Sequence, residues 1–365
     1  MQIKEITSFI ENLAPLAYQE PYDNAGLCIG EPEAEINGVL IALDVTEAVV
    51  DEAVRLGLGL IISHHPLIFS GLKKINGKSE TERCILKAIK NDLAIYSAHT
   101  NLDSVQGGVN SKIGEKLGLK NCRVLVPAEG QLKKLATFVP TADLDKVRNA
   151  LFEAGAGTIG NYDSCGFTVA GTGSFRGSEN TNPYVGERGK LHFEEETRLE
   201  TIFPKHLQNR VVSALLKAHP YEEVAYDIYP LDNLNPQVGM GMIGELEEPV
   251  DELDFLRSVK TIFGCEVIKH TALLHKKIKK VAVAGGSGSS FLRAAIAANA
   301  DVFISGDFKY HQFFEAENKI MVADIGHFES EQFTGELFCE LLTKNFPTFA
   351  VRLSEVKTNP VNYLI

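Results

Sequence analysis

Five side chains that can bind metal ions stand at the ends of short apolar runs in this sequence. They are His64, His65, Asp103, His327 and Glu331. Imidazole nitrogens and carboxylate oxygens together suit zinc first, with manganese or iron as alternatives. A structural zinc ion needs only four ligands, so five candidates favour a site for two divalent metal ions.

Each candidate ligand also has an ordinary structural interpretation. Adjacent strand residues point to opposite faces, so the histidine pair could be one core and one surface residue, although Pro66 favours a bend that turns both rings the same way. His327 and Glu331 could be an exposed pair in the first turn of a helix. Asp103 could cap a helix or close a turn. The recurrence of such clusters at strand ends favours the metal interpretation.

Other polar residues follow apolar runs as well. His99 is the candidate catalytic residue: we expect it to contact the substrate or a metal ligand, and the alternatives are proton transfer or a hydrogen-bonded place in the core. Asp307, Lys309 and His311 follow a later strand and could line the same cleft or lie in a solvated loop. The glycine-rich segment 285–289 could cradle an anion or form a tight turn.

The elements that would position these residues follow an α/β pattern. Strand patterns at 39–45, 58–62 and 93–97 alternate with helical patterns at 47–56 and 80–91. The histidine pair and the His99 cluster directly follow the second and third strands. Ligands bind at the carboxyl edge of such sheets, so we expect both clusters to meet there.

The C-terminal region repeats this order of elements. Strand patterns at 281–284, 301–304 and 320–323 accompany a helical pattern at 290–299. The repeat lies in the order of elements rather than in individual residues. We therefore expect two related α/β lobes around one dinuclear metal cleft.

The middle of the chain has a different pattern. Its order of strand, helix, strand, strand, helix and strand is typical of ferredoxin-like α+β domains. Gly, Ser, Asn and Pro are frequent in 173–189, which predicts a long loop between the middle strands. The predicted domains are an N-terminal lobe at 1–129, an inserted domain at 130–234 and a C-terminal lobe at 235–365.

Composition limits the classes of partner. The chain of 365 residues carries a formal net charge of −12, which argues against extensive nucleic-acid binding. Its six cysteines form no Cys-x-x-Cys pair, which favours free thiols in a reducing compartment, and no segment reaches the apolar length of a membrane span. We expect a cytoplasmic protein without membrane contact.

Several short segments together resemble one known family, the GTP cyclohydrolase I type 2 homologues, or Nif-three-like proteins. The segments are Pro21-Tyr22-Asp23-Asn24-Ala25-Gly26-Leu27, Ser63-His64-His65-Pro66, His99-Thr100-Asn101-Leu102-Asp103, Gly107-Gly108-Val109-Asn110, and Gly326-His327 with Glu331. The middle region, with its segment 219–223, is similar to the PII-like or CutA-like insert of the longer bacterial members. Tyr22 stands where the family often has Trp, a change expected to affect packing only.

The resemblance implies a two-metal centre with the five ligands named above, in which Glu331 bridges the ions. It further implies a toroidal homohexamer. Two neighbouring divalent ions would activate a bound water, so we expect hydrolysis of a small, nucleotide-like substrate, at a purine C–N bond or at a phosphoester. The family name implies GTP cyclohydrolase activity. The alternative function is a metal-dependent regulatory or scaffold protein that uses the insert as a sensor or lid.

Overall fold

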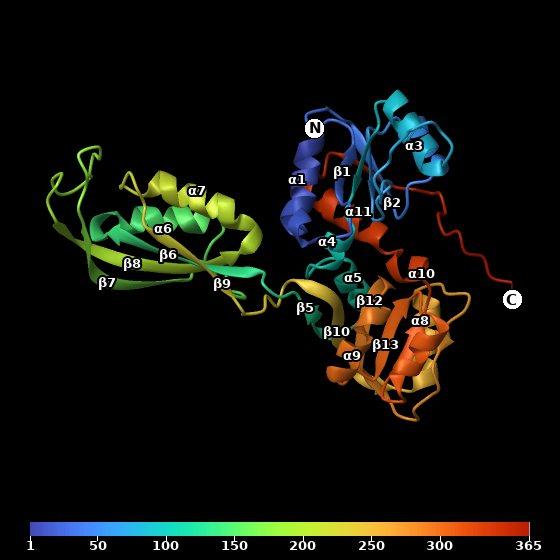
Figure 1. Cartoon of the computed structure of the whole chain (residues 1–365). Helices are drawn as coiled ribbons and strands as arrows, with labels where there is room; N and C mark the ends of the chain where they lie inside the picture. Colours follow the sequence, from blue (N-terminus) through green and yellow to red (C-terminus); the bar gives the residue numbers. More distant parts are fainter. Residues whose placement is uncertain (365) are drawn as a thin grey trace. The chain divides into compact units, whose positions relative to one another are not determined.

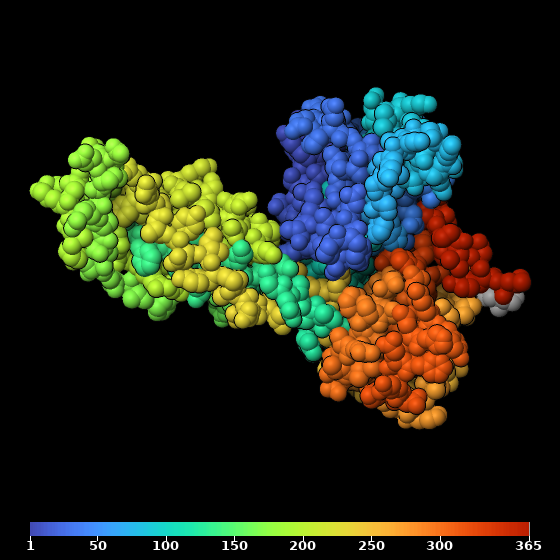
Figure 2. Space-filling view, in the orientation of Figure 1, coloured from blue at the N-terminus to red at the C-terminus, as the bar shows by residue number. Residues whose placement is uncertain are grey.

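The computed structural model describes residues 1–364 and divides into two compact units (Figure 1). The main unit combines Met1–Val126 with the chain from Gln237 onward, and the inserted unit is Pro127–Pro236. Figure 2 shows the N-terminal residues in blue and the C-terminal residues in red and orange packed into one body within the main unit. Among the described residues, no helix is both long and apolar enough to cross a bilayer.

The first sheet of the main unit contains the predicted N-terminal strands. Its five strands run in the order β1 (Gly26–Ile29), β4 (Ala94–Ser97), β3 (Leu60–Ser63), β2 (Gly38–Ala42) and β15 (Ala350–Leu353). The last four are mutually parallel, whereas β1 is antiparallel to β4. The carboxyl ends of β2, β3 and β4 therefore share one edge.

Both faces of this sheet are buried, which explains the continuous apolar runs in its strands. Leu40 and Ile61 pack against α2 (Glu47–Leu56) and α3 (Glu80–Lys90) on one face. Ile41, on the other face, joins the core that α1 (Ile3–Leu13) covers. The predicted helices at 47–56 and 80–91 are thus confirmed to within a residue.

The second sheet repeats the three central parallel strands. Its order is β11 (Lys269–His270), β14 (Met321–Asp324), β13 (Val302–Gly306), β12 (Ile278–Ser287), β10 (Gly239–Val250) and β5 (Lys120–Pro127). Strands β12, β13 and β14 are parallel, and β10 is antiparallel to β12. The predicted helix at 290–299 begins as a 3-10 turn, η4 (Ser289–Phe291), and continues as α9 (Leu292–Ala297).

Each half of the main unit lends an edge strand to the sheet of the other half. Strand β5 comes from the N-terminal half but lies in the second sheet, and β15 comes from the C-terminal half but lies in the first. One core joins both sheets and includes Ile62 and Ile304. The remaining helices of this unit are η1 (Leu16–Tyr18), α4 (Thr100–Asp103), α5 (Val109–Lys116), α8 (Glu252–Ile262), η5 (Tyr310–Ala316), α10 (His327–Glu331) and α11 (Thr334–Asn345).

The inserted unit has the predicted βαββαβ order. It comprises β6 (Leu132–Pro140), η2 (Thr141–Asp143), α6 (Leu144–Glu153), β7 (Gly166–Phe175), β8 (His192–Pro204), η3 (Lys205–Leu207), α7 (Gln208–Ala218) and β9 (Tyr226–Leu231). The antiparallel strands lie in the order β7, β8, β6, β9. Leu135 and Leu199 of the sheet form a core with Val147 and Val211 of the helices. This core is separate from that of the main unit.

Candidate metal centre

The metal-ligand candidates gather where strands of the two sheets end. His64 directly follows β3, and α4, which ends at Asp103, begins three residues after β4. In the second sheet, α10 begins at His327, three residues after β14. Because β3 and β4 are parallel with Ser63 opposite Ser97, their polar extensions leave the same edge.

His64 is completely buried, with one ring nitrogen in a hydrogen bond and the other without a hydrogen-bond partner. Its Nδ1 lies 2.9 Å from the carbonyl oxygen of Ala98. A carbonyl can only accept, so Nδ1 carries the proton and Nε2 presents its lone pair. His64 Nε2 and Asp103 Oδ1 are both buried without a hydrogen-bond partner. Two unsatisfied buried acceptors facing each other are costly unless a cation satisfies them.

The spacing of these atoms suits a metal ion. His64 Nε2 lies 3.8 Å from Asp103 Oδ1 and 3.6 Å from Glu331 Oε1. Two ligands of one tetrahedral zinc ion, each ~2.1 Å from the metal, are about 3.4 Å apart. The residues His64, Asp103 and Glu331 therefore form a group that could hold one ion.

A second group shares Glu331 with the first. Glu331 Oε2 lies 3.0 Å from the Nε2 atoms of both His65 and His327, and these two nitrogens are 3.2 Å apart. His65, His327 and Glu331 could together hold a metal ion. The two carboxylate oxygens of Glu331 thus face different groups.

Carboxylates outside the centre orient the second pair of histidines. His65 Nδ1 lies 2.7 Å from Asp44 Oδ1, and His327 Nδ1 lies 2.7 Å from Asp307 Oδ2. A carboxylate accepts the Nδ1 proton and so directs Nε2 into the centre, as in many metal sites. Asp307 was among the residues that the sequence predicted to line the cleft, because it follows β13, whereas the sequence analysis did not identify Asp44. Asp44 lies two residues beyond β2, and the rule for strand ends could have identified it.

His99 lies beside the centre and has its own carboxylate partner. Its ring centroid is 5.2 Å from that of His64 and 5.5 Å from that of His65. His99 Nδ1 lies 2.8 Å from Asp23 Oδ1, and Thr100 donates to the other oxygen of Asp23. With Nδ1 held, Nε2 of His99 is the atom left for a substrate or an ion. The sequence segment 21–27 contains Asp23, but no role had been predicted for it.

Two glycines of the segment 285–289 make room for Glu331. Gly286 has φ of +61°, and a Cβ there would lie 2.3 Å from Glu331 Oε1. The amides of Gly285, Gly286 and Gly288 donate to side-chain oxygens of Asn110, Ser330 and Ser305. These N–H groups are occupied, so the segment is a tight turn rather than an anion cradle.

Burial and close charges perturb the titration of the centre. Burial, partly opposed by His64, raises the pKa of Asp103 to about 7. Burial lowers the pKa of His65, but hydrogen bonds to Asp44 and Glu331 outweigh it and raise the pKa to about 10. For Glu331 burial acts upward, yet the surrounding histidines hold its pKa well below the usual range. Such opposed shifts in one cleft are typical of functional sites.

A cavity of about 470 Å³ opens next to His65 and His327. Asp307, Asp324 and Glu329 line it, and Lys269 is the one lysine or arginine among its described lining residues. Lys269 Nζ lies 2.5 Å from Asp324 Oδ2, so its charge is already paired. Lys309 and His311 do not line this cavity.

Known proteins resemble the whole chain. The family model described as Duf34/NIF3 (NGG1p interacting factor 3) matches residues 1–360. A Halalkalibacterium halodurans protein named GTP cyclohydrolase 1 type 2 homolog is 44% identical over 324 residues, covering 88% of this chain and 87% of that protein. A Bacillus subtilis protein of the same name is 40% identical over 367 residues, covering 99% of this chain and 98% of that protein.

Solved structures agree with these sequence matches. The crystal structure of a Bacillus cereus protein related to NIF3 matches with a TM-score of 0.86 and 41% identity, covering 100% of this chain and 99% of that one. A Staphylococcus aureus protein matches with a TM-score of 0.79 and 28% identity over the same shares of the two chains. The chain therefore belongs to the Duf34/NIF3 family, as its sequence motifs had predicted.

Proposed function

We propose that this protein is a metal-dependent hydrolase with two divalent ions in one centre. His64 and Asp103 would hold one ion, His65 and His327 the other, and Glu331 would bridge them. The observation that supports this assignment is the pair of ligand groups sharing Glu331, with buried, unpartnered His64 Nε2 and Asp103 Oδ1 in one of them. Zinc suits this mixture of nitrogen and oxygen ligands, with manganese or iron as alternatives.

The roles of the protein's own side chains follow from their geometry. Bound divalent ions would supply Lewis acidity and an activated water. His99, with Nδ1 on Asp23, is placed to move a proton at Nε2. Burial works against ionisation of Asp23, but hydrogen bonds from His99 and Thr100 outweigh it and lower the pKa of Asp23 to about 2. Asp23 therefore stays anionic and holds the orientation of His99 at neutral pH.

The cavity beside the centre limits the substrate. Its lining is acidic, and its single described lysine is paired, so it offers no cluster of cations for a triphosphate. We infer a small, nucleotide-like substrate, whose negative charge the bound ions would have to neutralise. GTP is the substrate that the relatives' name suggests, and it is the first compound to test.

The test combines metal analysis with turnover. Protein purified without added metal is analysed for ions per chain, and GTP is incubated with it and followed by product chromatography. Two ions with turnover that is lost in His99→Gln and kept in His311→Gln would support the hydrolase. Two ions with no turnover of GTP or of other nucleotides and phosphoesters would contradict it and leave the regulatory alternative.

The second candidate function is metal-dependent regulation. The inserted unit has its own core and a cavity of about 620 Å³, larger than the one beside the metal centre. Such a unit could sense a ligand while the main unit carries the metal. The discriminating measurement is water exchange at the bound metal, because a catalytic ion keeps an open position and a structural one is closed.

The wider organisation is proposed along the same lines. We propose related lobes at 1–129 and 235–365, a PII-like or CutA-like insert at 130–234, and assembly into homohexamers. A cytoplasmic location agrees with the six cysteines, all of which are free in the described chain. Light scattering and cell fractionation test the last two points.

A further inference from the structure

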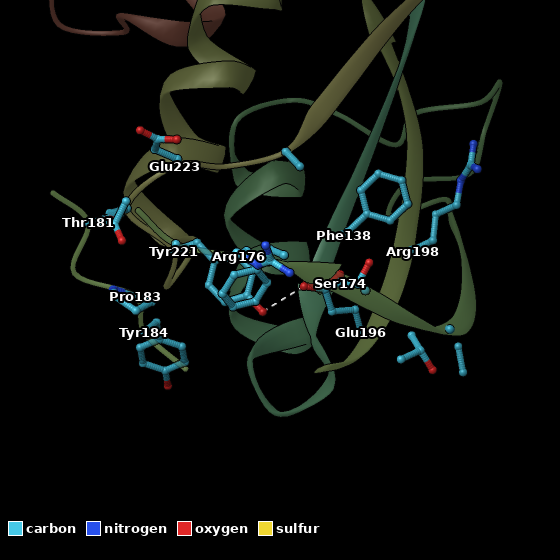
Figure 3. A pocket seen from close by; sticks show the side chains of 18 of the residues that line it. Phe138, Ser174, Arg176, Thr181, Pro183, Tyr184, Glu196, Arg198, Tyr221 and Glu223 are labelled. Carbon is cyan, nitrogen blue, oxygen red and sulfur yellow. Dashed lines mark hydrogen bonds between the residues drawn. The ribbon is translucent and has the colours of Figure 1, made fainter. Parts of the chain in front are cut away.

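The cavity of the inserted unit lies over the sheet face that its helices leave open. Leu135 and Leu199 point to the helices as part of the core. Phe138 and Glu196 are an odd number of residues from Leu135 and Leu199 on the same strands, so their side chains point to the other face of the sheet. Both line a cavity of about 620 Å³ on that face (Figure 3). This volume is typical of small-molecule sites.

A buried carboxylate forms the polar centre of this cavity. Glu196 is 9% exposed, and Tyr221 donates its hydroxyl to Glu196 Oε1 at 2.8 Å (Figure 3). Tyr221 contacts Oε1, and Oε2 is the oxygen that a ligand would meet. Gly173 packs directly against this carboxylate, because a Cβ at position 173 would lie 2.0 Å from Oε2 of Glu196. A carboxylate so placed needs an N–H donor or a cation once a ligand displaces water from the cavity.

Aromatic rings form the walls beside this carboxylate. The Tyr221 ring is 6.0 Å from that of Phe175 and 6.2 Å from that of Tyr184, measured between centroids. Ring faces attract ammonium and guanidinium groups and pack against flat or apolar bodies. The loop that carries Tyr184 is held to the unit by a hydrogen bond from the Asn182 amide to Glu222 Oε1 at 2.8 Å.

The charges around the cavity favour a cation over an anion. Glu196, Glu222 and Glu223 all line it. Arg198 also lines it, but its Nη2 atom lies 2.8 Å from Glu200, and Figure 3 shows its guanidinium pointing away from Glu196. Arg176 is the other arginine of the described lining, and it is exposed. Phosphate-bearing ligands would meet more carboxylates than free cations here.

We propose that the inserted unit binds a small organic cation in this cavity. The ammonium or guanidinium group of the ligand would donate to Glu196, and its flat or apolar body would pack against Tyr221, Phe175 and Tyr184. The site lies wholly within the inserted unit and does not depend on the function proposed for the metal centre.

The test uses the full chain, loaded with metal, and two cationic probes in titration calorimetry. Agmatine presents a guanidinium group, and tyramine presents an ammonium group on an aromatic body. We expect saturable binding of at least one probe with Kd below about 1 mM, weakened roughly tenfold or more in Glu196→Gln. Glu195→Gln is the matched control: it lies next to Glu196 on the same strand, is exposed and does not line the cavity, and it should bind like the parent.

A second variant guards against loss of folding at the buried position. Tyr184 is 57% exposed, so Tyr184→Ala should fold normally and weaken binding by roughly threefold or more through loss of a ring contact. Adenosine monophosphate serves as the anionic comparison and should not bind at this site. Absence of binding by both probes up to 10 mM, equal binding by Glu196→Gln, or preferential binding of the nucleotide would each overturn the proposal.

Discussion

At the scale of single residues, each histidine of the centre has one ring nitrogen fixed before any ion arrives. The fixed pairs are His64 with Ala98, His65 with Asp44, His327 with Asp307 and His99 with Asp23. An acceptor on Nδ1 keeps the proton on that nitrogen, so Nε2 is the nitrogen that can release its proton and bind an ion. These hydrogen bonds would therefore reduce the entropic cost of assembling the proposed metal centre.

The first prediction concerns the ligands themselves. His65→Ala and Glu331→Ala should each lose bound metal, because each variant removes a ligand from its group and Glu331 belongs to both groups. The fold should remain, since the core that joins the sheets is untouched. Elemental analysis with circular dichroism checks both points. His270→Ala, at an exposed histidine of β11, is the control and should keep its metal; unchanged metal content in both ligand variants would refute the site.

The second prediction concerns an orienting carboxylate. Asp307→Asn replaces the acceptor on His327 Nδ1 with an amide that can present either oxygen or NH₂. Metal affinity should fall about 10- to 100-fold while the ligand set stays complete. Competition with a chelator measures the change. Asp301→Asn, whose carboxylate bonds backbone amides near the start of β12 instead, should leave the affinity unaltered.

The third prediction concerns pH. In the metal-free protein, the hydrogen bond to Glu331, opposed by burial, raises the pKa of His327 to about 9, and that of His65 is raised to about 10. Both rings are therefore protonated at pH 7, and a metal ion must displace their protons. Calorimetry in buffers of different ionisation enthalpy should detect release of about two protons per chain at pH 7.

The direction of the pH dependence follows from these shifts. Zinc affinity should weaken as pH falls below about 9, because protons compete for the same ring nitrogens. The metal-free protein should behave oppositely: both histidines stabilise its fold fully below their ordinary pKa of 6.5, and this stabilisation disappears as pH rises through 9 to 10. Metal affinity independent of pH between 6 and 9 would contradict the assignment of these ligands.

At the scale of elements, two short helices, α4 and α10, carry three of the five candidate ligands, whereas His64 and His65 directly follow β3. Helix α10 has only five residues, and its ends carry His327 and Glu331 on one face. Ser330, in between, accepts a hydrogen bond from the Gly286 amide at the end of β12. The helix that carries the Glu331 carboxylate is thus fixed to the second sheet through a backbone contact.

The fourth prediction tests this close approach. Gly286→Ala would place a non-glycine residue in the left-handed region of backbone conformation and add a Cβ that collides with Glu331. It should therefore destabilise the protein by more than the backbone strain alone and also reduce metal binding. Gly57→Ala is the matched control, with φ of +66° and open space around it. It should cost about 1–2 kcal/mol and keep the metal. Equal losses of stability and full metal content in both variants would show that Gly286 has no role in the centre.

At the scale of the whole molecule, the inserted unit occupies the position in the chain where a loop would otherwise join the neighbouring strands β5 and β10. Strands β5 and β10 are neighbours in the second sheet. Gly241 packs against Leu125, and Gly244 packs against Cys122, so residue numbers rise on one strand as they fall on the other. The chain consequently leaves the main unit near Pro127 and returns close to the same point.

The fifth prediction follows from that geometry. Replacing residues 128–235 with a short Gly-Ser linker should give a folded protein that still binds its metal ions, because each unit has its own core. Thermal unfolding and metal analysis check the result. If the shortened chain fails to fold or loses the ions, the main unit depends on the insert for more than continuity of the chain.

Much of the fold was accessible from the sequence because it depends on local patterns. The buried strands of the first sheet and their helices follow from apolar runs and helical periodicity, and the predicted helix at 47–56 coincides with α2. The edge strands β5 and β15 were not predicted, because their assignment depends on pairing with distant segments. The expected domain limits at 129 and 234 stay predictions.

The sequence by itself determined the family, the order of elements and the residue types that could bind metal, since these depend on motifs and local periodicity. Only the tertiary structure decided that the two groups share Glu331, that Asp44 and Asp307 orient their histidines, and that a carboxylate lies buried in the inserted unit. These features join residues up to 267 positions apart, as with His64 and Glu331. Local sequence patterns do not specify the distance between such residues, because that distance depends on how the sheets pack around a common core.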